Sequence, residues 1–129
     1  MKYRILIIDE EEVARLIYKR SIYSLSNTLY EVVEAKTAKE ATNYIIRNRV
    51  DLVIMEINLP DVDGLRMFDI IKEYNPDMKV IVASIYPLVR QRQLIPFASG
   101  YYHKAEGLHH LMERVTRTIV LNTFEPLAH

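Results

Sequence analysis

Two patterns of hydrophobic residues alternate along the chain. Short continuous apolar runs lie at 5–8, 52–55 and 80–83, and such runs are typical of strands buried on both faces of a sheet. Two further strands are predicted at Tyr30–Ala35 and around Tyr101 and Tyr102. Between the strands, apolar residues recur at the spacing of a helix with one buried side. The pattern therefore predicts strands and helices in alternation.

The helices are predicted from apolar residues that share one side. These residues are Val13, Leu16, Ile17 and Tyr18 in the first helix, Ala38, Ala41, Tyr44 and Ile45 in the second, Leu65, Phe68 and Ile71 in the third, and Leu108, Leu111, Met112, Val115 and Ile119 in the fifth, with the fourth at 87–95. Thr37 and Glu40 have the spacing of a capping box, which would start the second helix. Asp63 is predicted to cap the third helix, and Asp61 to shape the loop before Gly64.

Strict alternation with short connections predicts an α/β fold, in which helices cover both faces of a parallel sheet. Right-handed crossovers leave the doubly wound strand orders as the common ones. In 129 residues, a five-stranded flavodoxin-like sheet of order 2-1-3-4-5 fits better than a six-stranded Rossmann sheet, and an eight-stranded barrel is too large. We expect one domain over residues 1–121, followed by a tail or linker stump at 122–129.

Composition narrows the classes of function. Seventeen Lys and Arg balance seventeen Asp and Glu, which argues against direct nucleic-acid binding and against a polybasic membrane-surface protein. The absence of cysteine excludes disulfides and a cysteine nucleophile. Because no apolar run approaches the about 20 residues that span a bilayer, we expect a cytoplasmic domain without membrane contact.

Chemically reactive side chains follow four of the predicted strands. Asp9 and Glu10 come after the first strand and Glu56 ends the third, while Ser84 and Lys104 follow the fourth and fifth. In the order 2-1-3-4-5, ligands bind beyond the carboxyl ends of the strands, near strands one and three. Helix dipoles would explain any one of these acids. Together, the five side chains are suited to Mg²⁺ and a phosphoryl group.

At this point the chain resembles the receiver domains of two-component response regulators. The resemblance is carried by the segments 5–10, 51–65, 80–84 and 98–104, and it runs in unbroken order from about residue 3 to 121. It implies transfer of a phosphoryl group, with Mg²⁺ bound, from a histidine kinase or phosphotransfer protein. The implied site residues are Glu56 at the acceptor position, Asp9, Glu10 and the backbone carbonyl of Asn58 as metal ligands, Lys104 as the phosphoryl contact, and Ser84 and Tyr101 as the switch positions.

The site departs from the family pattern in the length of two acids. Glu56 stands where the family has Asp and Glu10 where the family usually has Asp, and each change adds one methylene, or roughly 1.5 Å of reach. Because phosphoryl transfer depends on in-line placement, we expect phosphorylation to be impaired or absent and Mg²⁺ binding to be weakened. Both lengthened carboxylates could instead reach Lys104 and mimic the charge of the phosphorylated state.

Two more departures concern the face that the family often uses for output or dimer contacts. Ala105 replaces the usual Pro after the lysine, so a trans peptide bond is expected there. Pro96 and Phe97 stand where the fourth helix usually ends in Gly, which predicts a short or irregular helix. A homodimer through the fourth helix, fifth strand and fifth helix is one expectation.

Three functions stay open. The first is an atypical receiver domain with output through protein contacts, in one version the N-terminal part of a transcriptional regulator. The second is a conventional Mg²⁺-dependent phosphoacceptor that tolerates Glu56. The third, a small Mg²⁺-dependent phosphatase, ranks last because the chain lacks a substrate-covering cap and a D-x-D loop. Beyond self-catalysed phosphoryl transfer, no enzyme activity is expected. His109 and His110 point to different sides of a helix and predict no metal site.

Overall fold

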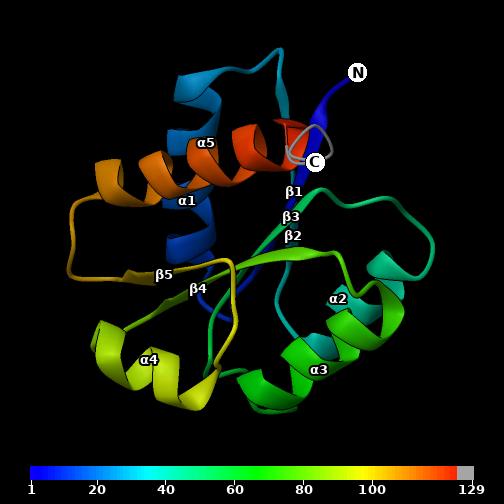
Figure 1. Cartoon of the computed structure of the whole chain (residues 1–129), viewed down its shortest axis with the longest axis vertical. Coiled ribbons are helices and arrows are strands. Elements are labelled where there is room, and N and C mark those ends of the chain that lie inside the picture. The colour runs from blue at the N-terminus through cyan, green and yellow to red at the C-terminus, as the bar shows by residue number, and fades with distance from the viewer. Residues whose placement is uncertain (125–129) are drawn as a thin grey trace.

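The computed structural model describes residues 1–124 and alternates strands with helices along the whole of that range (Figure 1). The strands are β1 (Tyr3–Ile8), β2 (Tyr30–Ala35), β3 (Leu52–Met55), β4 (Lys79–Ser84) and β5 (Gly100–His103), and the helices are α1 (Glu12–Leu25), α2 (Ala38–Ile45), α3 (Gly64–Tyr74), α4 (Leu88–Leu94) and α5 (Leu108–Phe124). Helix α5 continues past residue 121, and the expected tail lies outside the described residues from 125 onward.

The strands form one parallel sheet of order β2-β1-β3-β4-β5, as predicted. Strand β1 lies near the middle, where Ile5 pairs with Val32 of β2 on one side and with Leu52 of β3 on the other. Because all the strands run in the same direction, their carboxyl ends meet at one edge of the sheet. The loops that follow β1, β3, β4 and β5 are therefore brought together there.

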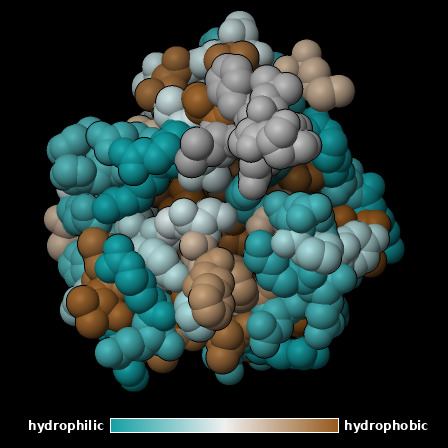
Figure 2. Space-filling model, viewed as in Figure 1, coloured by the Kyte–Doolittle hydropathy of each residue, from teal (hydrophilic) through white to brown (hydrophobic). Residues whose placement is uncertain are grey.

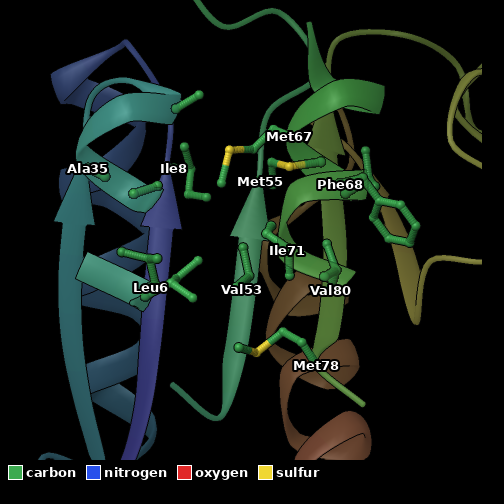
Figure 3. Packing of buried hydrophobic residues seen from close by; sticks show 14 of the residues in the cluster. Leu6, Ile8, Ala35, Val53, Met55, Met67, Phe68, Ile71, Met78 and Val80 are labelled. Carbon is green, nitrogen blue, oxygen red and sulfur yellow. The ribbon is translucent and has the colours of Figure 1, made fainter. Parts of the chain in front are cut away.

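Helices cover both faces of the sheet. Helices α1 and α5 lie on one face, and α2, α3 and α4 lie on the other (Figure 1). Alternate strand residues divide between two buried clusters, so that Leu6 faces α2 and α3 while Ile5 faces α1 and α5. Three methionines, Met55, Met67 and Met78, contribute flexible side chains to the first cluster (Figure 3). This packing fixes the strand ends on which the site is built.

The buried side of α1 differs from the predicted one. The helix forms as expected and Tyr18 is buried as predicted, but Val13, Leu16 and Ile17 are exposed. Its inward residues are Arg15, Tyr18 and Ile22. Arg15 is turned inward because its guanidinium donates hydrogen bonds to the backbone carbonyls of Asp9 and Glu10 at the end of β1. At this end of the helix, hydrogen bonds from Arg15 thus replace the apolar contact that the spacing predicted.

Capping bonds set the starts of α2 and α3. Thr37 accepts a hydrogen bond from the Glu40 backbone, and Asp63 accepts one from the Arg66 backbone, as predicted. Asp61 does more than shape its own loop, because its carboxylate accepts hydrogen bonds from the backbone N–H groups of Ala38 and Lys39. The β3–α3 loop is therefore tied to the first turn of α2.

The segment around α4 also agrees with the expectations. Helix α4 has only seven residues, and Phe97 beyond it adopts a left-handed φ of 70°. The peptide bonds of the described residues, including Lys104–Ala105, are all trans. In the view of Figure 2, hydrophilic side chains cover most of the surface and hydrophobic ones show in separate small groups. Of the helices within residues 1–124, none is both long and apolar enough to cross a bilayer.

Candidate functional site

Three charged side chains from three strand ends meet at the carboxyl edge of the sheet. Nζ of Lys104 lies 2.8 Å from Oδ2 of Asp9 and 2.8 Å from Oε1 of Glu56. The side chains of Asp9 and Glu56 are almost completely buried, at 3% and 7% exposed, and that of Lys104 is 15% exposed. The centre of the site is therefore one ammonium group bonded to two buried carboxylates.

The position of Lys104 follows from strand pairing. Its backbone N–H donates to the carbonyl of Ser84, which continues the β4–β5 ladder by one residue. Burial alone would lower the pKa of Lys104, but the hydrogen bonds to Asp9 and Glu56 and the charges of these two groups raise it above its ordinary value. Lys104 is consequently a fixed positive charge at neutral pH.

Both carboxylate oxygens of Glu56 have partners. Oε1 bonds Lys104, and Oε2 accepts from the backbone N–H groups of Ile57 at 2.6 Å and Asn58 at 3.2 Å. The side chain is thus folded back over the start of its own loop. Such charge-assisted bonds hold a carboxylate in one orientation.

Glu10 stays outside this cluster. Its side chain is exposed, and within residues 1–124 only its backbone carbonyl has a recorded partner, Arg15. The prediction that both lengthened acids reach Lys104 is therefore right for Glu56 and wrong for Glu10. The exposed Glu11 lies closer to the lysine, with 3.9 Å between Oε1 and Nζ. A solvated pair at this distance adds little stability.

The donor set implied by the resemblance does not fit Mg²⁺ in this arrangement. Among the residues that the structure describes, no three or more acidic or histidine side chains are grouped so that they could hold a metal ion. Asp9 and Glu56 both direct an oxygen at Lys104, whose positive charge already compensates theirs and so reduces their attraction for a further cation. Glu10 is turned to solvent.

The two expected switch residues have partners of their own. The hydroxyl of Ser84, which is fully buried, accepts a bond of 3.4 Å from the Tyr86 backbone. The Tyr101 hydroxyl donates to the carbonyl of Ile95 at 2.6 Å and accepts from the backbone of Ala98 at 3.2 Å. The Tyr101 side chain, on β5, is therefore turned toward the core, and its hydroxyl is bonded to the segment between α4 and β5.

Two buried polar residues that sequence reasoning missed support the site. Besides its bonds to the loop after β1, Arg15 forms an ion pair with Glu34 at the end of β2, at 3.0 Å. Gln91 of α4 is fully buried, and its side-chain amide donates to the carbonyls of Ser84, Tyr86 and Tyr102 at 3.3, 2.7 and 3.0 Å. The helical patterns gave no signal for either, because a polar residue in an amphipathic helix is normally placed outward.

Comparison with known proteins identifies relatives of this chain. The response regulator receiver domain family matches residues 5–116. The response regulator MprA of Mycobacterium sp. (strain KMS) is 30% identical over 117 residues, which is 89% of this chain and 50% of MprA. The transcriptional regulatory protein DegU of Brevibacillus brevis is 32% identical over 117 residues, 88% of this chain and 49% of DegU. The chain thus spans about half the length of these curated relatives.

Among solved structures, the response regulator TrrA from Thermotoga maritima superimposes with a TM-score of 0.81 and 29% identity. The match covers 92% of this chain and 99% of TrrA. TrrA was crystallised in complex with Mg(2+)-BeF. The flavodoxin-like order that both share is the one predicted from the alternation of strands and helices.

Proposed function

The chain belongs to the response regulator receiver domain family, and on that premise we propose that it is an atypical receiver of two-component signalling whose acceptor position is impaired in phosphorylation. The observation that carries the proposal is the bridge of Lys104 between Asp9 and Glu56, at 2.8 Å on each side. Its output is a contact with another protein.

The bridge works against phosphoryl transfer in two ways. Phosphoryl transfer needs an attacking oxygen aligned with the line of transfer, yet the Glu56 carboxylate is held in one orientation, with Oε1 bonded to Lys104 and Oε2 to two backbone N–H groups. In addition, Lys104, which is expected to contact an incoming phosphoryl group, is already paired with the carboxylates of Asp9 and Glu56. Glu56 therefore places a negative charge against Lys104, where a phosphoryl group would otherwise lie.

The same bridge bears on the metal. Because an ammonium group lies between two of the implied ligands, we infer that Mg²⁺ binds at Asp9, Glu10, Glu56 and the Asn58 carbonyl only weakly, if Lys104 stays in place. No step of the proposed function depends on the ion. The domain acts without turnover of a substrate.

The partners follow from the family. Receiver domains interact with histidine kinases or phosphotransfer proteins, and we extend this to the present chain. A homodimer through α4, β5 and α5 stays part of the proposal, as does a cytoplasmic location. Since MprA and DegU are about twice as long as the matched region, we also propose that this chain acts as the receiver part of a transcriptional regulator.

Intact-mass measurement tests the impaired acceptor. The native chain is incubated with acetyl phosphate and Mg²⁺, and its mass is expected to stay unchanged. A stoichiometric gain of one phosphoryl group that disappears in Glu56→Gln would overturn the proposal and support a conventional phosphoacceptor that tolerates Glu. Steady hydrolysis of p-nitrophenyl phosphate by the native chain, lost in the same variant, would instead support the small phosphatase.

A further inference from the structure

A largely apolar pocket of about 300 Å³ lies next to the Lys104 bridge, between α1 and the start of α5. It is on the face of the sheet that α1 and α5 cover, away from α4 (Figure 1). Most of its lining is formed by apolar and aromatic side chains, namely Val13, Ala14, Ile17, Tyr18, Tyr102 and Leu108. Lys104, Glu11 and Glu106 add charged groups. We propose that this side pocket binds a small neutral molecule with a ring-sized apolar body and a carbonyl oxygen.

The walls of the side pocket account for two exposed apolar residues of α1. Val13 and Ile17 are 65% and 40% exposed, although the helical pattern predicted that they face inward. They lie one turn apart on the same side of the helix and line the pocket together with Leu108 of α5. The rings of Tyr18 and Tyr102 meet edge to face in the same lining, with centroids 6.4 Å apart. Apolar and aromatic walls and a volume of about 300 Å³ are typical of pockets for small molecules.

Two hydrogen-bond donors in the lining are not fully used. An ammonium group has three N–H bonds, and Lys104 directs two of them at Asp9 and Glu56. Glu11, at 3.9 Å, is too far away to accept the third. The hydroxyl of Tyr18, a residue only 4% exposed, has no recorded partner within residues 1–124, and burial raises the pKa of Tyr18, so that the hydroxyl keeps its proton at neutral pH. Because an unbonded buried donor costs free energy, both groups favour a ligand with an acceptor oxygen.

The charges around the side pocket favour a neutral ligand. The positive charge of Lys104 is already compensated by two buried carboxylates, and Glu11 lies near it as well, so an anion would gain little. Glu106 is bonded to Arg114 at 3.2 Å. A cationic ligand would bring a second positive charge close to the ammonium of Lys104. A carbonyl oxygen, in contrast, accepts an N–H bond without adding a charge.

A ligand in the side pocket would act on the bridge, because Lys104 belongs to both. An oxygen that accepts the third N–H bond holds the ammonium between Asp9 and Glu56, so the ligand and the bridged form favour each other. The ligand is thus an input that reaches the site without phosphoryl transfer. This role as input rests on the proposed impaired acceptor, whereas the binding itself does not.

An NMR titration of the isotope-labelled full chain, without phosphoryl donor, tests the inference. The probes are acetophenone, ethylbenzene, which lacks the carbonyl oxygen, and benzoate and benzylamine, which carry a charge beside the ring. Saturable shifts are expected at Ala14, Ile17, Tyr18 and Leu108 with acetophenone, with a dissociation constant on the order of 1 mM for so small a ligand. The other three probes should bind about threefold more weakly or worse.

Two pairs of variants locate the binding site. Tyr18→Phe removes the hydroxyl and keeps the ring, so it should weaken acetophenone about threefold and leave ethylbenzene unchanged. Tyr23→Phe, on the same helix but outside the lining, is its control. Ile17→Ala should weaken both probes about threefold, whereas Leu16→Ala should weaken neither, since Leu16 is 42% exposed but does not line the pocket. Because Ile17 and Leu16 are similarly exposed, both variants should fold like the native chain.

Other results would overturn the inference. Equal binding of acetophenone and ethylbenzene would mean that no donor takes part, and tighter binding of benzoate or benzylamine would assign the pocket to a charged ligand. Equal weakening by Leu16→Ala and Ile17→Ala would mean unspecific attraction, and an absence of saturable binding would rule the site out. The mass measurement with acetyl phosphate contains none of these probes. A gain in mass with binding retained would therefore contradict only the proposed function, and an unchanged mass without binding only the side pocket.

Discussion

The ammonium group of Lys104 lies 2.8 Å from a carboxylate oxygen of Glu56, although the two residues are 48 positions apart in the chain (104 minus 56). Glu56 makes this contact with Oε1 while its other oxygen bends back to accept hydrogen bonds from the two residues that follow it. The lysine expected to contact a phosphoryl group is thus bonded to side chains of its own chain.

Removing the ammonium should cost stability. In Lys104→Met, the buried carboxylates of Asp9 and Glu56 lose their shared cation, and we expect the free energy of unfolding to fall by about 3 kcal/mol at neutral pH. Urea unfolding followed by circular dichroism measures the change. Lys19→Met is the matched control, since Lys19 pairs with Glu34 at 3.5 Å and is 39% exposed; it should cost less than about 1 kcal/mol.

The pH dependence of this loss has a definite sign. The pKa of Lys104 is raised above its ordinary value of 10.5, so its contribution is complete below that pH and is lost only as the pH rises further. The gap between native chain and Lys104→Met should therefore persist at neutral pH and narrow in strong alkali. A loss no larger than that of Lys19→Met would contradict the buried bridge.

Shortening the acceptor should restore phosphorylation. In Glu56→Asp the carboxylate withdraws by roughly 1.5 Å from Lys104, which frees both the lysine and an attacking oxygen. Incubation with acetyl phosphate and Mg²⁺ should then add one phosphoryl group to most of the protein, as seen in the intact mass, with Glu56→Gln unchanged. If Glu56→Asp also stays unmodified, the obstacle lies elsewhere in the site, with Glu10 and Ala105 as the next positions to test.

Asp61 should stabilise the protein through the N-terminus of α2. Bonds from the backbone N–H groups of Ala38 and Lys39 lower the pKa of Asp61 against the opposing effect of burial. Because the pKa is lowered, the stabilisation is present at neutral pH. It is lost as the pH falls below about 3.9, the ordinary pKa of Asp, toward the lower pKa of the folded state.

The comparison of Asp61→Asn with the native chain removes the charge and one of the two accepted hydrogen bonds, because Asn has a single accepting oxygen. Its deficit in the free energy of unfolding should be about 1 kcal/mol at neutral pH and should shrink in acid, where the native carboxylate is protonated too. Thermal unfolding from neutral to acidic pH measures it. A deficit that stays constant over that range would show that the charge plays no part, and Asp77→Asn, which lies outside the cap, should show none.

Gly64 should tolerate no side chain. A Cβ atom there would lie 2.7 Å from Cα and 2.9 Å from the carbonyl oxygen of Ile57, both backbone atoms that cannot move aside cheaply. We expect Gly64→Ala to lower the free energy of unfolding by about 2 kcal/mol, despite the higher helix propensity of Ala. Gly100→Ala, where the nearest atom is 3.6 Å away, is the control; equal costs would refute the steric explanation.

Much of the fold was predictable because it depends on local pattern. The apolar runs at 5–8, 52–55 and 80–83 mark buried strands, and chain topology then brings their carboxyl ends together. The meeting of Asp9, Glu56 and Lys104 follows from that convergence. What the pattern left open was the direction of individual polar side chains. Glu10 and Glu56 look alike in sequence, but Glu56 directly follows β3 and bonds Lys104, whereas Glu10 lies one residue further from the end of its strand and is exposed.

Arg15 marks the second limit. Helical spacing placed Val13, Leu16 and Ile17 inward, and the structure places Arg15 there. The reason is that the backbone carbonyls at the end of β1 require a hydrogen-bond donor, which Arg15 supplies. That need arises only once the strand end and the helix have been packed together, so no single segment of sequence reveals it.

Gln91 has a consequence for how the molecule moves. A helix of seven residues has almost no stability of its own, and α4 is joined to its surroundings by core packing of Leu94 and Ile95 and by one amide that donates to three carbonyls on both sides of it. The opposite orientation of this amide would set oxygen against oxygen, and the present one leaves Oε1 without a hydrogen-bond partner in the described residues. Because the three bonds share one side chain, we expect them to break together. The amide protons of α4 should then exchange with solvent at similar rates rather than progressively from the helix ends.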